Sequence, residues 1–430
     1  MESGSGRGKG ARARTLGFWS LLALGVNGIV GVGIFFVPAQ VAARVPGMGG
    51  VGVYALTAAA LAPVAWAYAT LGGHFDEDGG PYVWARAAFG ARIGFAVGWV
   101  AYVSALFSTS AVMAGLAEHA APSLGLSSPL AERGFIVVCT LLLGSVVASG
   151  LKPSAIAWNA VTVLKLLPLL GLAALALAAA APIAPDAHAG GGVGGVMRAA
   201  LVVVFAMQGF EIVPVPAGNA RASRRAIPLA TLGSLAGATV LYLILQWACV
   251  RAVPGLSHSG RPLVDAAAVY GGRSGEWLVA AGTNISALGI AFGMFAMSPR
   301  YLSTLGRPDG LGEWVGRESG RHVPQRALWI TLALVLVLST NGKLGELFVL
   351  SSVSVLAQYA VSVAALAVLA VKRKNGLGLR HLWPAPLALG AILLLGQAAK
   401  AVELLVFAGV LAAGGLVVLL RRFSARRAAR

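Results

Sequence analysis

The feature that most constrains this chain is a series of twelve apolar runs, most of them close to 20 residues or longer, separated by charged or Gly/Pro-rich stretches. About 20 helical residues cross a bilayer core roughly 30 Å thick, so each run is a candidate transmembrane helix. The runs are 16–44, 49–71, 93–117, 133–149, 155–181, 196–217, 228–252, 276–298, 326–340, 344–371, 383–399 and 402–420. Only 11% of the residues are charged, against roughly 25% in soluble domains. The pattern predicts an all-α integral membrane protein with 12 transmembrane helices.

Lysine and arginine are distributed unevenly between these runs. The chain holds 33 Lys and Arg against 15 Asp and Glu, a net charge of +18. With the N-terminal tail in the cytoplasm and residues near run ends counted with the adjoining loop, 24 of the 33 fall on the cytoplasmic side and 8 on the external side, and only Lys165 lies deep within a run. This bias follows the positive-inside rule. It predicts a cell-membrane protein with both termini cytoplasmic, and it accounts for the positive charge without a nucleic-acid partner.

Glycines interrupt the first run, in the string GVNGIVGVGIFFVPA. They are Gly25, Gly28, Gly31 and Gly33. Each costs a helix interior up to about 1 kcal/mol relative to alanine. One interpretation is close packing of helices through small residues. Gly31 and Gly33 do not share a helix face, however, which favours an unwound segment. Such a segment is tolerated at membrane depth where it lines a cavity, and its free N–H groups attract an anion.

The sixth run repeats this pattern. Gly209 lies within the run beside Glu211, and Pro214 and Pro216 follow. Proline removes a backbone donor and disfavours helix in the residue before it, so this run should be broken and its second half distorted. Breaks in the first and sixth runs occupy equivalent positions in two five-helix halves. This arrangement indicates an inverted-repeat transporter with its site at the midplane of the bilayer.

Over about residues 16–370 the chain resembles the amino acid, polyamine and organocation (APC) permease superfamily. The matching stretches are Gly28–Phe35 with Pro38, the GGPYVWARAAFG loop at Gly79–Gly90, FAMQGFE at Phe205–Glu211, the SRRAIP run ending at Pro228, VPQRAL at Val323–Leu328 and SSVSVLAQY at Ser351–Tyr359. The resemblance implies a LeuT-type 5+5 inverted repeat, with helices 1 and 6 broken at the midplane and two further helices at the C-terminus. It also implies alternating-access transport of amino acids or related amines, and no enzymatic activity.

This resemblance divides the chain into five parts. The cytoplasmic N-terminal tail is 1–15, the first repeat 16–181, the second repeat 182–371, helices 11 and 12 occupy 372–420, and the C-terminal tail is 421–430. The expected partners are a small-molecule substrate and the lipid bilayer. No cofactor is expected apart from a coupled proton, and the sequence assigns no protein partner.

Site residues carry over from the family by position. The N–H groups of Val32, Gly33 and Ile34 would bind the substrate's carboxylate, and carbonyl groups near Ile29, Phe205 and Gln208 would bind its ammonium. This distribution suits a zwitterion, because two broken helices supply donors and acceptors without burying a formal charge. Phe205 matches an aromatic residue that closes over substrate, and Glu211 matches the acidic gating residue after the helix-6 break. Val32 departs from the family, which often has a hydroxyl at this position.

Lys165 lies ten residues into its run, roughly 15 Å deep and too far from either surface to snorkel. A lysine at this depth costs about 2.5–3.5 kcal/mol even on the lower scales, and it is functional by default. Relatives with a lysine at the matching place are proposed to use it in proton coupling, which predicts that Lys165 titrates during symport. The alternative is a permanent cation that bonds carbonyls of helices 1 and 8 in place of a sodium ion. In that case transport would be amino acid exchange.

Specificity residues are expected on helices 3 and 8, which line the distal pocket in relatives. Ser108 and Thr109, with Ser104 nearby, lie on the first of these helices and Phe295 on the second, although ordinary helix packing also explains them. Apart from Glu211, the other acids near the runs, Glu276 and Glu403, fall at span ends. Little buried acid would therefore pair with a cationic side chain, which favours a neutral amino acid.

Two other classes of membrane protein fit the sequence less well. A membrane-embedded enzyme needs clustered Asp, His or Glu near the interface. The acidic run Asp76–Asp78 lies in a glycine-rich loop and is interpreted as a solvated turn, and the six histidines show no metal-binding spacing. A channel would need a filter of charged rings or exposed carbonyls. Paired broken helices favour a carrier.

Overall fold

The computed structural model describes residues 17–77, 79–126, 128–150, 155–179, 191–219, 223–306, 311–317 and 323–428. Within these ranges the chain is helical and forms no strand. The helices are α1 (Phe18–Ile29), α2 (Gly33–Ala42), α3 (Gly49–His74), α4 (Pro81–Phe89), α5 (Ala91–Ser123), α6 (Pro129–Ala148), α7 (Ala155–Ala178), α8 (Gly192–Met207), α9 (Ser223–Ala252), α10 (Pro262–Thr304), α11 (Glu313–Gly316), α12 (Gln325–Asn341), α13 (Leu344–Val371), α14 (Pro384–Gly396) and α15 (Ala401–Ala428). Short 3₁₀ turns are η1 (Phe210–Ile212), η2 (Ala217–Asn219), η3 (Leu256–His258) and η4 (Leu379–His381).

Seven described helices are long and apolar enough to cross a membrane. They are α3, α5 over Ala91–Ala121, α6, α9 over Arg224–Ala252, α10, α13, and η4 with α14 over Leu379–Gly396. The pair α1 and α2, bent by 44° at its break, makes an eighth. Four shorter apolar helices are Thr162–Ala178, Gly192–Met207, Gln325–Asn341 and Ala401–Val417. The protein is therefore a multi-pass membrane protein. Every run predicted from the sequence overlaps one of these segments, while the count of twelve spans stays a prediction.

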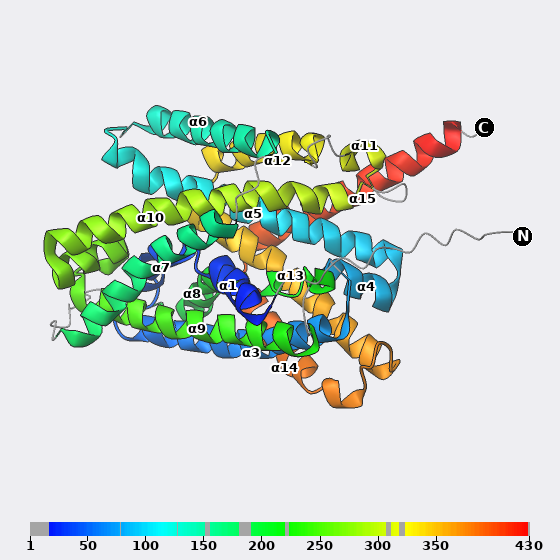
Figure 1. Cartoon of the computed structure of the whole chain (residues 1–430), viewed down its shortest axis with the longest axis horizontal. Coiled ribbons are helices and arrows are strands. Elements are labelled where there is room, and N and C mark those ends of the chain that lie inside the picture. Colours follow the sequence, from blue (N-terminus) through cyan, green and yellow to red (C-terminus); the bar gives the residue numbers. More distant parts are fainter. Residues whose placement is uncertain are drawn as a thin grey trace, which may run out of the picture.

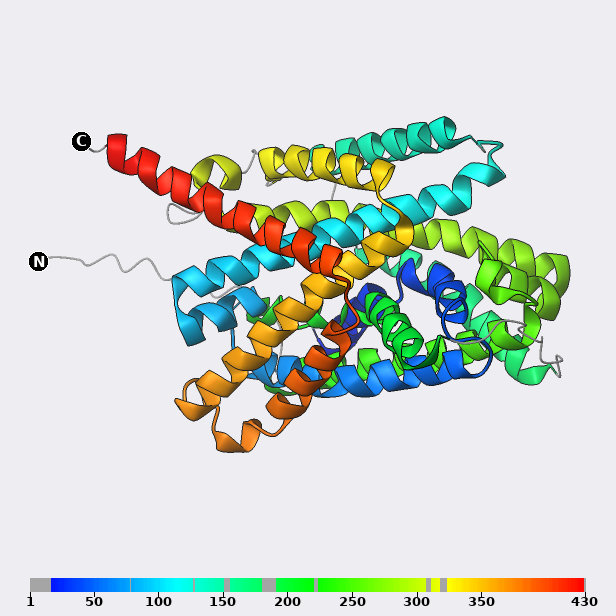
Figure 2. The same ribbon diagram turned by 180° about the vertical axis from the view of Figure 1, so that it is seen from behind.

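The broken helices lie at the centre of the bundle. Figure 1 shows α1 and α8 in the middle of the molecule, with α3 and α9 along one side and α5 and α10 along the other. From behind, α13 crosses the bundle and α14 and α15 pack against it (Figure 2). The last residues of α15 lie at the same end of the molecule as α4 and α11. A break in either central helix is thus enclosed by protein on several sides.

The second half of the sixth run is more irregular than a broken helix requires. After α8 ends at Met207, the chain forms η1, a turn at residues 213–216, and η2. Pro214 and Pro216 explain this, because each lacks an N–H donor and disfavours helix in the residue before it. The expected distortion therefore takes the form of 3₁₀ turns in place of a second half-helix.

Candidate functional site

The break in the first span exposes backbone donors. α1 ends at Ile29 and α2 begins at Gly33, and the Gly31 N–H turns back to the Ile29 carbonyl at 2.7 Å. Within the described part of the chain, the N–H groups of Val32, Gly33 and Ile34 donate to no other group. These groups begin α2, where the helix dipole adds partial positive charge. The arrangement can hold an anion such as a carboxylate.

The break in the sixth span touches the break in the first. Gly209 has φ +128°, a conformation that residues with a side chain rarely adopt. A Cβ atom on Gly209 would lie 2.3 Å from the carbonyl carbon of Gly28. The two backbones therefore meet directly, and only glycine at position 209 allows this approach. The contact brings the donors of one break next to the acceptors of the other.

The carbonyl groups expected to take an ammonium differ in availability. The Ile29 carbonyl accepts from the Tyr242 hydroxyl at 2.8 Å as well as from the Gly31 N–H. A carbonyl oxygen has two lone pairs, so in this conformation Ile29 is already satisfied. The carbonyls of Phe205 and Gln208 accept no hydrogen bond from the residues that the structure describes. The Gly209 N–H, which would continue the helix to Phe205, instead donates to the Glu211 carboxylate.

Phe205 packs on the α8 side of the breaks. Its side chain is buried, and its ring stacks on that of Phe348 from α13, with centroids 4.2 Å apart and planes inclined by 26°. Because α8 runs from Gly192 towards Gly209, this stack lies on the α8 side of the break, away from Glu211. The two rings pack α8 against α13 beside the breaks.

A chain of side-chain hydrogen bonds joins three helices at the level of Gln208. Ser108 of α5 and Ser351 of α13 share a hydrogen bond of 2.6 Å, and the Gln208 amide donates to Ser351 at 3.1 Å. Ser351 was not singled out as a site residue from the sequence. Its only sequence signal is its place in the SSVSVLAQY stretch, which shows a small polar helix face but no partner.

Thr109 and Phe295 take part in packing between α5 and α10. The Thr109 hydroxyl donates to the Ala105 carbonyl at 2.6 Å and lies 3.1 Å from the Ser298 hydroxyl. Phe295 of α10 is fully buried. Neither side chain bonds to the residues of the two breaks. Thr109 lies on α5 and Phe295 on α10, and their contacts are those of a helix interface.

Glu211 lies on the opposite side of the break from Phe205. Its carboxylate accepts from the Gly209 N–H at 2.7 Å and from the Tyr359 hydroxyl at 2.9 Å. Tyr359 also packs against Phe210 and Tyr68. The carboxylate therefore holds the backbone of the break and ties it to α13.

A cavity of about 650 Å³ leads to Glu211, and we call it the vestibule. It opens on the face that carries α4 and the end of α10, and its lining includes Tyr82, Arg86, Glu211, Arg300, Tyr301 and Gln358. Ser351 lies two helical turns, about 10 Å, beyond Gln358 on α13, so the vestibule reaches Glu211 but not the serine and glutamine hydrogen bonds. One face of the molecule thus gives access almost to the breaks.

Lys165 reaches the first break from α7. Its side chain is fully buried, and its amine donates to the carbonyls of Asn27 at 2.9 Å and Val30 at 2.7 Å. Among the described residues no carboxylate pairs with it. Both acceptors belong to helix 1, whereas the structural alternative from sequence expected helix 8 to contribute as well. The amine bonds the backbone that forms the break.

The described residues offer no grouping of three or more His, Cys, Asp or Glu side chains that could hold a metal ion. Asp76 and Glu77 lie in the loop between α3 and α4, and Asp78 lies outside the described residues. The polar groups described around the breaks are backbone dipoles, hydroxyl groups, the Glu211 carboxyl and the Lys165 amine.

Replacing Ser351 by alanine is expected to destabilise the protein by about 1–3 kcal/mol, because the Ser108 hydroxyl and the Gln208 amide lose their shared partner. The neighbouring Ser352 bonds only the Phe348 carbonyl of its own helix, so Ser352→Ala should cost less than about 1 kcal/mol. Thermal unfolding of the two purified variants checks this. Equal stability of the two variants would show that the hydrogen bonds between helices contribute nothing.

Comparison with known proteins identifies the family of this chain. The profile of the family described as amino acid permease matches residues 16–417. The chain is 27% identical to the branched-chain amino acid permease BcaP of Lactococcus lactis, over 74% of this chain and 73% of that protein. It is 25% identical to the methylthioribose transporter of Bacillus subtilis, over 84% and 82%, and 26% identical to the arginine/ornithine antiporter of Pseudomonas aeruginosa, over 75% and 71%. The chain belongs to the amino acid permease family, within the APC superfamily, and is a transporter and not an enzyme.

Proposed function

We propose that the protein carries amino acids across the cell membrane by alternating access. The observation that carries this proposal is the direct contact of two broken helices, with free N–H groups on one and free carbonyls on the other. A zwitterion needs both kinds of group within a few ångströms, and the contact at Gly28 and Gly209 provides them together. The vestibule supplies a route from one face.

The proposed architecture is the 12-helix LeuT-type arrangement. The repeats are 16–181 and 182–371, followed by helices 11 and 12 at 372–420, with cytoplasmic tails at 1–15 and 421–430. Breaks in the first and sixth spans support the repeat, and the eight candidate spans with the four shorter apolar helices support the count. The bias of Lys and Arg supports the orientation, in which the vestibule faces the cytoplasm.

In the proposed binding mode, the carboxylate accepts hydrogen bonds from Val32, Gly33 and Ile34. The ammonium donates to the carbonyls of Phe205 and Gln208. The Ile29 carbonyl joins them only when Tyr242 has released it, so binding at Ile29 requires a rearrangement of α9 against helix 1. Phe205 and Glu211 act as gates on either side of the break.

The substrate proposed is a neutral amino acid. The helices nearest the expected side-chain pocket carry the hydroxyl groups of Ser108 and Thr109 and the ring of Phe295. Glu211 is the only carboxylate beside the breaks among the described residues, and it already accepts two hydrogen bonds. A cationic side chain would therefore lack a free counter-charge.

Coupling is proposed to be proton symport with Lys165 as the titrating group. Its amine bonds two carbonyls of the helix-1 break, so a change in its protonation acts directly on the backbone that would hold the substrate. The second candidate is exchange of two amino acids, with Lys165 as a permanent pin. The two carbonyl bonds also suit that role, and one relative is named as an antiporter.

A panel of radiolabelled amino acids in proteoliposomes, with and without an imposed proton gradient, tests the proposal. We expect uptake of neutral amino acids in preference to arginine, lysine and glutamate, and accumulation that rises when the outside is acidic. Preferential uptake of a cationic amino acid would contradict the substrate class. Uptake of no amino acid at all would contradict the function itself.

A further inference from the structure

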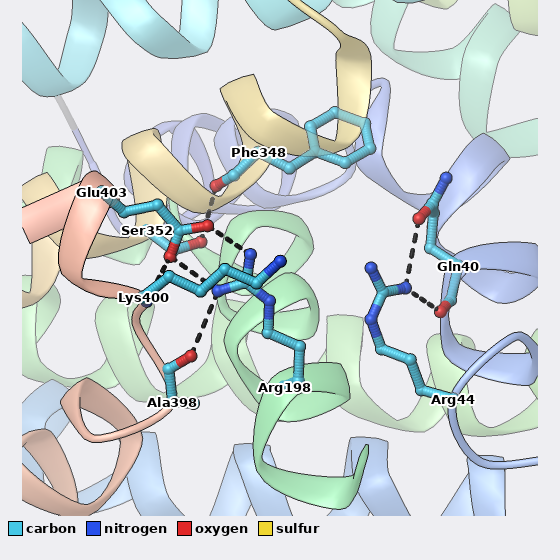
Figure 3. Close-up of polar contacts among 8 residues, drawn as sticks. All are labelled: Gln40, Arg44, Arg198, Phe348, Ser352, Ala398, Lys400 and Glu403. Carbon is cyan, nitrogen blue, oxygen red and sulfur yellow. Dashed lines mark hydrogen bonds and ion pairs between the residues drawn. The ribbon is translucent and has the colours of Figure 1, made fainter. Parts of the chain in front are cut away.

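The N-terminal half of α8 carries a buried ion pair that the proposed transport site does not use. Arg198 of α8 forms a two-pronged salt bridge with Glu403 of α15, with one of its bonds at 2.6 Å. The same guanidinium donates to the Ala398 carbonyl at 3.1 Å, and Glu403 accepts from the Lys400 N–H at 2.8 Å. Figure 3 shows Arg198 reaching from α8 to Glu403 and Ala398. Both side chains are mostly buried.

The position of this pair matters because α8 carries Phe205. Arg198 lies seven residues before Phe205, about 10 Å further from the vestibule along the same helix. Four contacts therefore follow one another along this path: Arg198 with Glu403, Phe205 with Phe348, Gln208 with Ser351, and Glu211 with Tyr359. The vestibule reaches the last of them, and the first two lie on the other side of the breaks.

A second guanidinium, that of Arg44, lies near Arg198. The stability of the ion pair therefore depends on the negative charge of Glu403. Burial, together with the nearby charge of Arg198, lowers the pKa of Arg44, which follows α2. Arg44 bonds the side chain and carbonyl of Gln40, and its own carbonyl accepts from the Gly191 N–H at the start of α8. Two cations thus lie near each other, Arg44 just after α2 and Arg198 in the N-terminal half of α8, and Glu403 is the carboxylate that neutralises Arg198 (Figure 3).

We propose that the Arg198 and Glu403 pair is a latch that holds the α8 half of helix 6 against α15 and keeps this face closed while the vestibule is open. Glu403 thereby acts as a positioning residue from a helix outside the two repeats. Removing its charge leaves Arg198 buried and unpaired near Arg44, which favours separation of α8 from α15. The inference rests on the proposed alternating access and assigns a role in it to the C-terminal helices.

Accessibility of a cysteine placed behind the latch tests this proposal. Val202 is fully buried and lies one turn from Arg198 on the same helix face. Val202→Cys is introduced in a chain whose Cys139 and Cys249 are replaced by alanine, and labelling by a membrane-impermeant thiol reagent is followed in nanodiscs. With the latch intact, labelling should be slow. Glu403→Gln should accelerate it about tenfold, equivalent to ~1.4 kcal/mol.

Two further variants define the outcome. The charge-swapped protein, Arg198→Glu with Glu403→Arg, should label nearly as slowly as the parent. Glu276→Gln, which removes an exposed carboxylate 3.9 Å from Arg261, should leave the rate unchanged. An unchanged rate in Glu403→Gln would overturn the latch, as would equally fast labelling of the charge-swapped protein. If Glu403→Gln does not fold, Glu403→Asp decides, with about threefold acceleration expected and an unchanged rate contradicting the proposal.

This readout needs no substrate. The latch can therefore fail while the amino acid panel succeeds, in which case α15 is passive packing for a working transporter. The reverse result, fast labelling in Glu403→Gln without uptake of any amino acid, would support a latch on this face and contradict amino acid transport as the function.

Discussion

Replacing Lys165 by methionine is expected to reduce accumulation driven by a pH gradient at least about tenfold, while counterflow exchange without a gradient continues. Methionine fills a similar volume but cannot donate to the Asn27 and Val30 carbonyls or carry a proton. The two carbonyls lose their donor, so the break in helix 1 no longer responds to protonation. Uptake of a neutral amino acid into proteoliposomes, with acidic or equal external pH, measures the effect.

The control for this variant is Lys343→Met, which removes an exposed lysine in the loop before α13. It should leave both modes of uptake unchanged. Gradient-driven accumulation that survives in Lys165→Met would contradict proton coupling through this residue and favour the exchanger. If counterflow is lost as well, Lys165 is needed for the structure of the break, and a role in coupling is contradicted.

The second large effect is expected from Gly209→Ala. An alanine Cβ would lie 2.3 Å from the Gly28 carbonyl carbon and 2.5 Å from the Ile29 nitrogen, and φ +128° is unfavourable for any residue with a side chain. Since both atoms belong to the backbone of helix 1, the clash can be relieved only by separating the two breaks. We expect destabilisation of about 3 kcal/mol or more, with loss of transport.

Gly237→Ala provides the matched control, because Gly237 lies within α9 with nothing within 4 Å of an added Cβ. In a helix interior this change should be neutral or stabilising by up to about 1 kcal/mol. Thermal unfolding and amino acid uptake of both variants check the comparison. Normal uptake by Gly209→Ala would show that the close contact of the two breaks is not needed for transport.

The sequence predicted the helical segments and the two breaks well, because both follow from local chemistry. Apolar runs set the helices, and glycines at Gly31, Gly33 and Gly209 mark the irregular backbone. The 3₁₀ turns after Gly209 were predicted only as a distortion, since two nearby prolines exclude a regular helix without determining what replaces it.

Pairings between distant segments could not be predicted in the same way. Lys165 was recognisable by its depth, but its acceptors at Asn27 and Val30 depend on how α7 packs against helix 1. Glu403 was placed at a span end with no partner, and its bond to Arg198 joins residues 205 positions apart. The bond of Tyr242 to the Ile29 carbonyl likewise leaves no pattern in the sequence.

The proposed site would bind a zwitterion with few charged side chains. Backbone donors of α2 and acceptors at the end of α8 are fixed by the fold and cost no buried formal charge. Side chains then connect these backbone groups to their surroundings, Lys165 to helix 1 and Glu211 to the helix-6 break. Changes in either side chain therefore act on the geometry of the binding groups.

The most direct test of proton-coupled transport is the luminal pH of proteoliposomes that hold a pH-sensitive dye, followed after a neutral amino acid is added without any imposed gradient. Proton symport predicts that the lumen becomes acidic as the amino acid enters, and that Lys165→Met abolishes this change. Entry of the amino acid with no change in luminal pH would contradict the account.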